Sequence, residues 1–130
     1  MSREILFRGK SIGTDEWLYG NLFNYGLTAP SNVPCISVCV PTSWKEAYNL
    51  YAVHPDTIGQ YTGLKDKNGK KIFEGDIISI GEPNIKYITM WRDAGLCAKQ
   101  IGASSYIGLT YWASDIEVLG NVIDNPELMK

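Results

Sequence analysis

Short stretches of alternating apolar and polar residues run along this chain, and clusters of Gly, Asn and Pro separate them. The clearest example is segment 17–23, where Trp17, Tyr19 and Phe23 occupy positions at even spacing. Residues at even spacing share one face of a β-strand, and aromatic and β-branched residues favour strands. The pattern predicts an all-β protein with strands at residues 5–8, 17–23, 77–80, 85–92, 106–112 and 117–123.

The segments between these strands carry turn signals. A turn over residues 9–15 should join the first two strands into a hairpin, and a Gly- and Ser-rich loop is expected at 95–105. The pair Asn68-Gly69 is typical of a type I′ turn, so the chain should reverse there. Ser43 and Glu46 have the spacing of a capping box, which predicts a short helix in the middle of the chain, or else a loop.

Composition narrows the class of protein. The 130 residues are 45% hydrophobic, enough for the core of one domain or of two small lobes. The formal net charge of −2 gives no overall positive field to attract a polyanion. The longest apolar stretch, residues 33–40, is far shorter than the roughly 20 residues of a membrane-spanning helix. Since the N-terminal segment lacks a secretory signal and the cysteines are odd in number, we expect a cytoplasmic protein with free thiols.

Few residues offer catalytic or metal chemistry. His54 is the single histidine, and its place before a proline favours an ordinary loop residue over a catalytic base. Cys35, Cys39 and Cys97 lack the short ligand spacings of a zinc site. No glycine-rich motif has the spacing that cradles a phosphate or a dinucleotide. We therefore predict no catalytic residue, no metal and no cofactor, and an enzyme is the least favoured class.

The candidate interaction surface is a lysine-rich turn and the acidic residues after it: Lys65, Lys67, Lys70, Lys71, Glu74 and Asp76. A solvated turn is favoured over a phosphate-binding site, because acidic residues lie among the lysines. Glu74 and Asp76 could act as an acid and base pair, but Gly75 between them favours a turn in which Asp76 accepts backbone N–H groups.

The aromatic residues of segment 17–23 could stack on nucleic-acid bases. No row of Lys or Arg flanks them along the chain, so a place in the hydrophobic core is favoured.

Several segments resemble the YopX family, small proteins carried by phages and prophages. The similarity begins at Arg3–Lys10 and Glu16–Gly20, is densest over Asp56–Ile77 and closes at Glu117–Leu128. The resemblance implies an N-terminal β region, residues 1–64, and a C-terminal SH3-like barrel region, residues 65–130; one core shared by the two regions is the alternative to two separate cores. It also implies expression in the cytoplasm of a bacterial host, and the family supplies no catalytic residue.

Two functions remain open. The first is a phage or prophage accessory protein without catalytic activity, which binds itself as a homo-oligomer or binds a host or phage protein; exposed strand edges favour such contacts. The alternative is a nucleic-acid-binding accessory protein that uses the lysine-rich turn together with Lys86 and Arg92.

Overall fold

The computed structural model describes residues 5–24, 34–37, 50–82, 84–92, 95–108 and 114–129. Every regular element in these ranges is a β-strand or a short 3₁₀ helix, so the predicted all-β class is confirmed. The chain forms two compact units, Met1–Gln60 and Tyr61–Lys130. The division falls within strand β5 (Gly59–Lys65), as does the boundary expected after residue 64, which stays a prediction.

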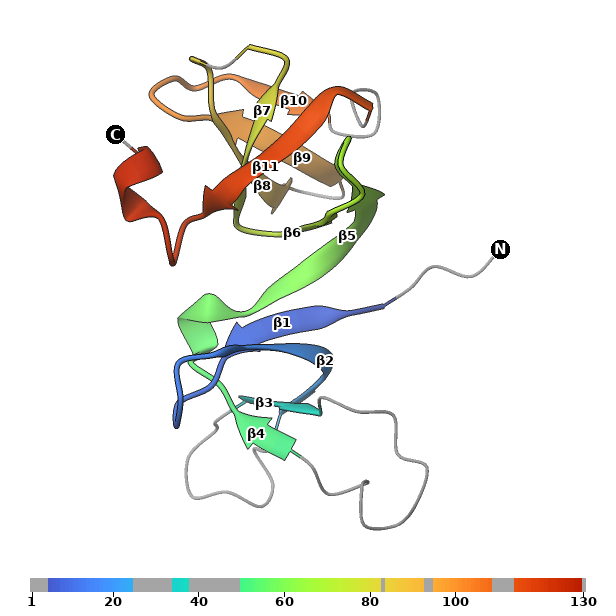
Figure 1. Ribbon diagram of the computed structural model, residues 1–130, viewed down its shortest axis with the longest axis vertical. Coiled ribbons are helices and arrows are strands. Elements are labelled where there is room, and N and C mark those ends of the chain that lie inside the picture. The colour runs from blue at the N-terminus through green and yellow to red at the C-terminus, as the bar shows by residue number, and fades with distance from the viewer. Residues whose placement is uncertain are drawn as a thin grey trace. The chain divides into compact units, whose positions relative to one another are not determined.

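The first unit consists of short antiparallel strands that lie side by side in chain order (Figure 1). These are β1 (Phe7–Lys10), β2 (Trp17–Asn24), β3 (Pro34–Ser37) and β4 (Leu50–Ala52). The second edge of β1 pairs with β5, where Gly59 lies opposite Arg8. Ser11, directly after β1, forms a further bridge with Val53. Between those two contacts the chain turns through the 3₁₀ helix η2 (Pro55–Thr57). Strand β1 therefore has a hydrogen-bonded neighbour on each side, which fixes the direction of its side chains.

The core of the first unit lies on one side of β1. Ile36 and Val53 are fully buried there, and Gly9 faces them. A Cβ atom on Gly9 would lie 3.1 Å from the Val53 Cβ and 3.3 Å from the Ile36 Cδ1. Glycine at this position lets the strand approach the core closely. Side chains alternate between the two faces of a strand, so Arg8 and Lys10 lie on the face opposite the core.

The predicted hairpin of the first two strands is confirmed, with Arg8 opposite Tyr19 and Lys10 opposite Trp17. The turn expected over 9–15 begins too early, because Gly9 and Lys10 belong to β1 and the close packing of Gly9 keeps the strand regular. The core assignment is wrong for Tyr19, which is 46% exposed on the face opposite Gly9.

The second unit contains a five-stranded antiparallel sheet with the order β10-β9-β8-β7-β11 (Figure 1). Its strands are β7 (Asp76–Ile80), β8 (Tyr87–Arg92), β9 (Gly95–Gln100), β10 (Tyr106–Gly108) and β11 (Ile116–Asn121). Strand β6 (Lys71–Phe73) pairs with the later residues of β5, and the 3₁₀ helix η4 (Pro126–Met129) follows β11. The closure of these strands into an SH3-like barrel stays a prediction.

Burial of aliphatic side chains holds the second unit together. Ile72, Ile78, Ala98 and Ile116 are fully buried in one cluster. Partly buried apolar residues pack around it: Leu64, Ile80, Tyr87, Leu96, Ile107 and Val118. Full burial of an isoleucine side chain stabilises a fold by roughly 1.5–3 kcal/mol, so this cluster is a major source of stability.

The expectation of a loop over 95–105 is wrong for residues 95–100, which form strand β9. It pairs with β8 along its whole length, from Arg92 opposite Gly95 to Tyr87 opposite Gln100. The glycine and serine residues of segment 95–105 indicated a loop. In the structure Ala98, a small residue in the middle of β9, is fully buried. A true turn follows the strand, with Gly102 at a φ of 86°. The helix or loop expected around Ser43 lies outside the described residues.

The chain reverses at 66–70 as predicted, but the type I′ assignment is wrong. Gly69 has a φ of 83°, whereas Asn68 is not among the described residues with positive φ. The Gly69 N–H donates to the Asp66 carbonyl at 3.0 Å, and the Asp66 N–H donates to the Lys70 carbonyl at 2.8 Å. This is the pattern of a type I turn followed by a left-handed glycine. The Asp66 carboxylate, which accepts the Asn68 N–H, stabilises that alternative.

Candidate functional site

The lysines of the lysine-rich turn differ in exposure and in the groups they contact. Lys65, Lys67 and Lys70 are exposed, and Lys71 is half-buried. The Lys71 ammonium lies 5.5 Å from the centre of the Tyr61 ring, and the Lys67 ammonium lies 3.7 Å from the Glu117 carboxylate. Such contacts are typical of a solvated surface turn. A role for these lysines in binding a partner stays a prediction.

The Asp66 carboxylate holds this turn by hydrogen bonds to backbone N–H groups. Asp66 is 6% exposed, and its two carboxylate oxygens accept backbone N–H groups of Asn68 and Lys70 at 2.9 Å and of Val118 at 3.0 Å. Burial alone would raise the pKa of this carboxyl group. The three N–H donors and the positive charge of Lys70 outweigh that effect and hold its pKa below the ordinary value. Asp66 thus ties the turn to strand β11.

The two carboxylates after the turn have different surroundings. Asp76 is 2% exposed and accepts the Phe73 N–H at 2.7 Å, while its own N–H donates to the Thr89 hydroxyl at 3.0 Å. The Thr89 hydroxyl donates in turn to the Phe73 carbonyl at 2.6 Å. Gly75, with a φ of 92°, makes the tight connection possible. Asp76 therefore holds the turn into β7, while Glu74 is only half-buried.

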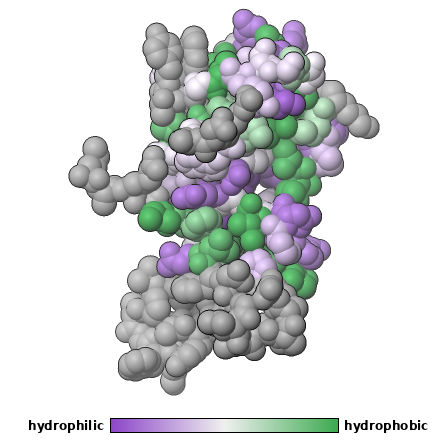
Figure 2. Space-filling model, turned by 180° about the vertical axis from the view of Figure 1, so that it is seen from behind, coloured by the Kyte–Doolittle hydropathy of each residue, from purple (hydrophilic) through white to green (hydrophobic). Residues whose placement is uncertain are grey.

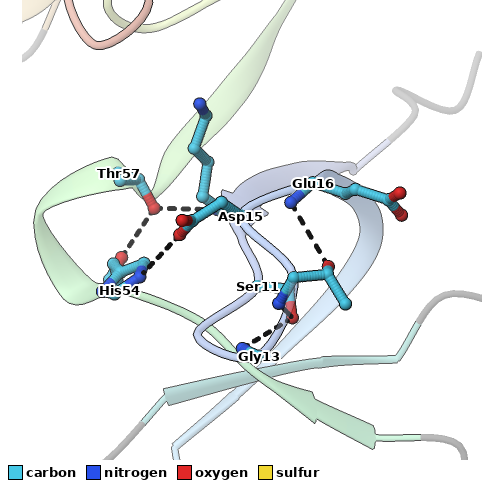
Figure 3. A network of polar contacts seen from close by, with 8 residues as sticks. Ser11, Gly13, Asp15, Glu16, His54 and Thr57 are labelled. Atoms are coloured by element: carbon cyan, nitrogen blue, oxygen red, sulfur yellow. Dashed lines mark hydrogen bonds and ion pairs between the residues drawn. The ribbon is translucent and has the colours of Figure 1, made fainter.

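His54 belongs to a polar network between the β1–β2 turn and helix η2 (Figure 3). Its Nε2 lies 3.2 Å from an Asp15 carboxylate oxygen, and its carbonyl accepts the Thr57 hydroxyl at 2.7 Å. The same Thr57 hydroxyl accepts the Lys10 N–H at 2.8 Å. In the adjoining turn the Ser11 hydroxyl oxygen accepts the Gly13 N–H at 3.2 Å, so it stabilises the turn. This network joins two loops of the first unit.

The cysteines have no shared site in the described part of the chain. Cys35 and Cys97 are half-buried thiols, and Cys39 lies outside the described residues. Burial raises the pKa of the Cys35 thiol. The described His, Cys, Asp and Glu residues form no group of three or more that could hold a metal ion.

A pocket in the second unit has a volume of about 240 Å³. Its walls are Ile80, Glu82, Ile85, Tyr87 and Ile107, from β7, the following loop, β8 and β10. Four of these side chains are mainly apolar, and the exposed Glu82 adds one negative charge. The volume is below the 300–1,000 Å³ usual for drug-sized ligands. The pocket therefore suits a single side chain better than a large cofactor.

Sequence patterns along a single strand missed a group of residues that the sheet register brings together. We call Arg8, Lys10, Trp17 and Tyr19 the hairpin face. The Arg8 guanidinium carbon lies 4.7 Å and the Lys10 ammonium 5.4 Å from the centre of the Trp17 ring. These are cation–π distances. The signal in the sequence was the alternation of two cations on the first strand with two aromatics on its hairpin partner.

Exposed apolar side chains occur in both units. Among the described residues, large apolar or aromatic side chains with more than about a third of their surface exposed include Ile5, Ile12, Tyr19, Tyr51, Trp91, Tyr106, Leu119 and Met129. Figure 2 shows apolar residues interspersed with polar ones over the described surface on that side. None of the helices in the described ranges has the length and apolar character needed to span a bilayer.

Comparison with known proteins places the chain in a family. The crystal structure of protein EF1440 from Enterococcus faecalis is similar in fold, with a TM-score of 0.59 and 24% sequence identity. The match covers 99% of this chain and 100% of that one. No curated protein matches the sequence. The model of the YopX protein family matches residues 6–130, nearly the whole chain, and the protein therefore belongs to the YopX family.

Proposed function

We propose that this protein is an accessory protein of phage or prophage origin, without catalytic activity, that binds a second protein chain in the cytoplasm of a bacterial host. The second chain is another copy of this protein or a host or phage protein. The resemblance to YopX proteins of phages and prophages supports the origin. The pocket beside β10 supports binding, because a recessed apolar site can receive an anchoring side chain.

The chemistry of the pocket defines the side chain that it would take. Ile80, Ile85 and Ile107 supply apolar contact, and Tyr87 adds an aromatic ring. Glu82 is the acidic residue of the wall and is exposed. An apolar anchor with a lysine or arginine beside it would satisfy both features. The volume of about 240 Å³ limits the anchor to about one large side chain.

The polar clusters of the described residues support a binding role over catalysis. Asp76 and Thr89 are buried and satisfy backbone groups of their own turn. His54 lies beside Asp15, and the nearby Ser11 hydroxyl oxygen accepts backbone N–H groups of its turn. The polar groups thus have structural partners, whereas the apolar wall of the pocket is open to a ligand.

The test combines light scattering with affinity capture from bacterial lysate, and uses the intact chain. Glu82→Lys reverses the charge at the pocket, and Asp115→Lys makes the same change at an exposed position of the same unit. We expect self-association or capture of a specific protein by the unmodified chain, lost in Glu82→Lys and retained in Asp115→Lys. A monomer at all concentrations that captures nothing, or equal behaviour of the two variants, would contradict the proposal.

A further inference from the structure

The turn between β5 and β6 contains Asn68-Gly69, the one place in the sequence where a glycine directly follows an asparagine. Both residues are exposed, and a Cβ atom added to Gly69 would have no heavy atom within 4 Å. Water therefore reaches the Asn68 carboxamide, and no side chain shields the Gly69 nitrogen. The carbonyl carbon of an asparagine side chain is open to attack by the main-chain nitrogen of the next residue. The pair thus holds both groups of an intramolecular reaction.

We propose that Asn68 is a site of spontaneous deamidation, a modification separate from the protein binding proposed above. The Gly69 nitrogen attacks Asn68 Cγ, so a new N–Cγ bond forms while the Cγ–Nδ2 bond breaks. The side-chain nitrogen leaves as ammonia and takes the proton that the Gly69 amide gives up. Water then opens the cyclic imide: addition at Cγ gives aspartate, and addition at the main-chain carbonyl gives isoaspartate. Water is the one co-reactant, and no electrons are gained or lost.

The folded turn restrains this reaction. The Gly69 N–H donates to the Asp66 carbonyl at 3.0 Å, and the nitrogen must leave that bond before it can lose its proton. In a type I turn the third residue, here Asn68, has a ψ of about 0°, which turns the next nitrogen away from the side chain. Ring closure therefore needs a large rotation about the Asn68 Cα–C bond, and that rotation opens the turn.

The Asp66 side chain controls how readily the turn opens. One of its carboxylate oxygens accepts the N–H groups of Asn68 and Lys70, both at 2.9 Å, from the two sides of Gly69. Rotation about the Asn68 Cα–C bond moves one of these N–H groups relative to the other, so a single oxygen cannot keep both bonds. The second oxygen accepts the Val118 N–H at 3.0 Å, which holds the carboxylate in place. Asp66 therefore slows the modification of Asn68 in the folded chain.

The products of the reaction fit the turn less well than asparagine does. Isoaspartate lengthens the main chain by a methylene group before Gly69, so the hydrogen bonds that close the turn cannot all keep their lengths. Either product also places a second carboxylate in the turn that holds the Asp66 carboxylate, and like charges repel. We expect the modified chain to unfold at a lower denaturant concentration than the unmodified chain.

Peptide mapping by mass spectrometry tests the proposal on the intact chain. The protein is incubated at neutral pH with and without guanidinium chloride, and conversion of Asn68 to the two acids is followed over time. We expect conversion in both conditions, at least about tenfold slower in the folded chain, which corresponds to about 1.4 kcal/mol for opening of the turn. Asn84, which is exposed but precedes an isoleucine, is the internal control and should convert more slowly than Asn68 in guanidinium chloride.

Variants separate the effect of Asp66 from that of the sequence pair. Asp66→Ala should speed conversion of Asn68 in the folded chain by roughly fivefold or more, with the rate of the unfolded chain as the upper limit. Asp115→Ala, at an exposed position of the same unit, should leave the rate unchanged. Circular dichroism confirms that each variant is folded. The comparison in guanidinium chloride uses no variant, so it remains decisive if Asp66→Ala does not fold.

Three results would overturn the proposal: equal rates at Asn68 in the folded and unfolded chains, no conversion in the unfolded chain, or an unchanged rate in a folded Asp66→Ala variant. None of these results bears on capture of a protein through Glu82. Failure of the deamidation proposal and failure of the protein-binding proposal are therefore distinguishable.

Discussion

Replacement of Asp66 by alanine should destabilise the second unit, because this side chain joins a surface turn to strand β11. The substitution removes one acceptor for three backbone N–H groups. Loss of a side chain that caps exposed N–H groups, here those of Asn68 and Lys70, costs about 0.5–2 kcal/mol. The half-buried Val118 N–H also loses its acceptor, and leaving this donor without a partner costs about 1–3 kcal/mol. We expect a total loss of about 1.5–5 kcal/mol in the free energy of unfolding.

The charge of Asp66 makes part of this stability dependent on pH. Its pKa in the folded protein is below the ordinary value of 3.8, because the backbone donors and Lys70 outweigh the effect of burial. A carboxyl group with a lowered folded pKa stabilises the fold fully above its unfolded pKa. That contribution is lost as the pH falls through the folded pKa. Asp66→Asn, which does not titrate, should therefore show a weaker loss of stability below about pH 4.

Urea unfolding followed by circular dichroism and amide hydrogen exchange measures these effects. Exchange at amides of the paired strands β7 and β8, which do not donate to Asp66, reports the second unit by itself, so separate unfolding of the first unit does not obscure the result. Asp115→Ala, at an exposed position of the same unit, is the matched control and should change stability little. An Asp66→Ala variant as stable as this control, or an Asp66→Asn variant with an unchanged acid dependence, would refute the reasoning.

Two further substitutions test contacts inside the second unit. Thr89→Val keeps the shape of a residue that is 1% exposed but removes the hydroxyl that accepts the Asp76 N–H, so urea unfolding should show a loss of about 1–3 kcal/mol. Gly120→Ala would place a Cβ atom against the Asn125 side chain, whose Oδ1 accepts the Asn121 N–H at 3.2 Å. We expect that bond to break, with a cost of about 1 kcal/mol and faster amide exchange at Asn121; unchanged exchange would show that Asn125 moves without cost.

Alternation within one strand was enough to predict much of the fold. The even spacing of Trp17 and Tyr19 placed strand β2 correctly, and the run of isoleucines from Ile77 placed β7. Strand β9 was missed because glycine and serine around it resembled a loop. Its stability comes from pairing with β8 and from the burial of Ala98, and neither feature is visible in the local composition. Tertiary context overrides local preference at such positions.

The role of Asp66 shows a second limit of local sequence patterns. Asn68-Gly69 correctly indicated a reversal, but the type of turn depends on a carboxylate two residues before Asn68. The same carboxylate bonds Val118, which is 52 positions away in the chain. A motif that considers only the turn cannot include this long-range bond, which joins the turn to strand β11.

The hairpin face shows the same limit for a cluster of side chains from two strands. Trp17 and Tyr19 were assigned to the core because no cation neighbours them on their own strand. The cations lie on the partner strand, where Arg8 and Lys10 meet them at positions that only the pairing register defines. In a β protein a cluster of side chains on one face is therefore a property of two strands together. A search for aromatic and basic residues at directly opposed positions of each expected hairpin would have identified this surface before the fold was known.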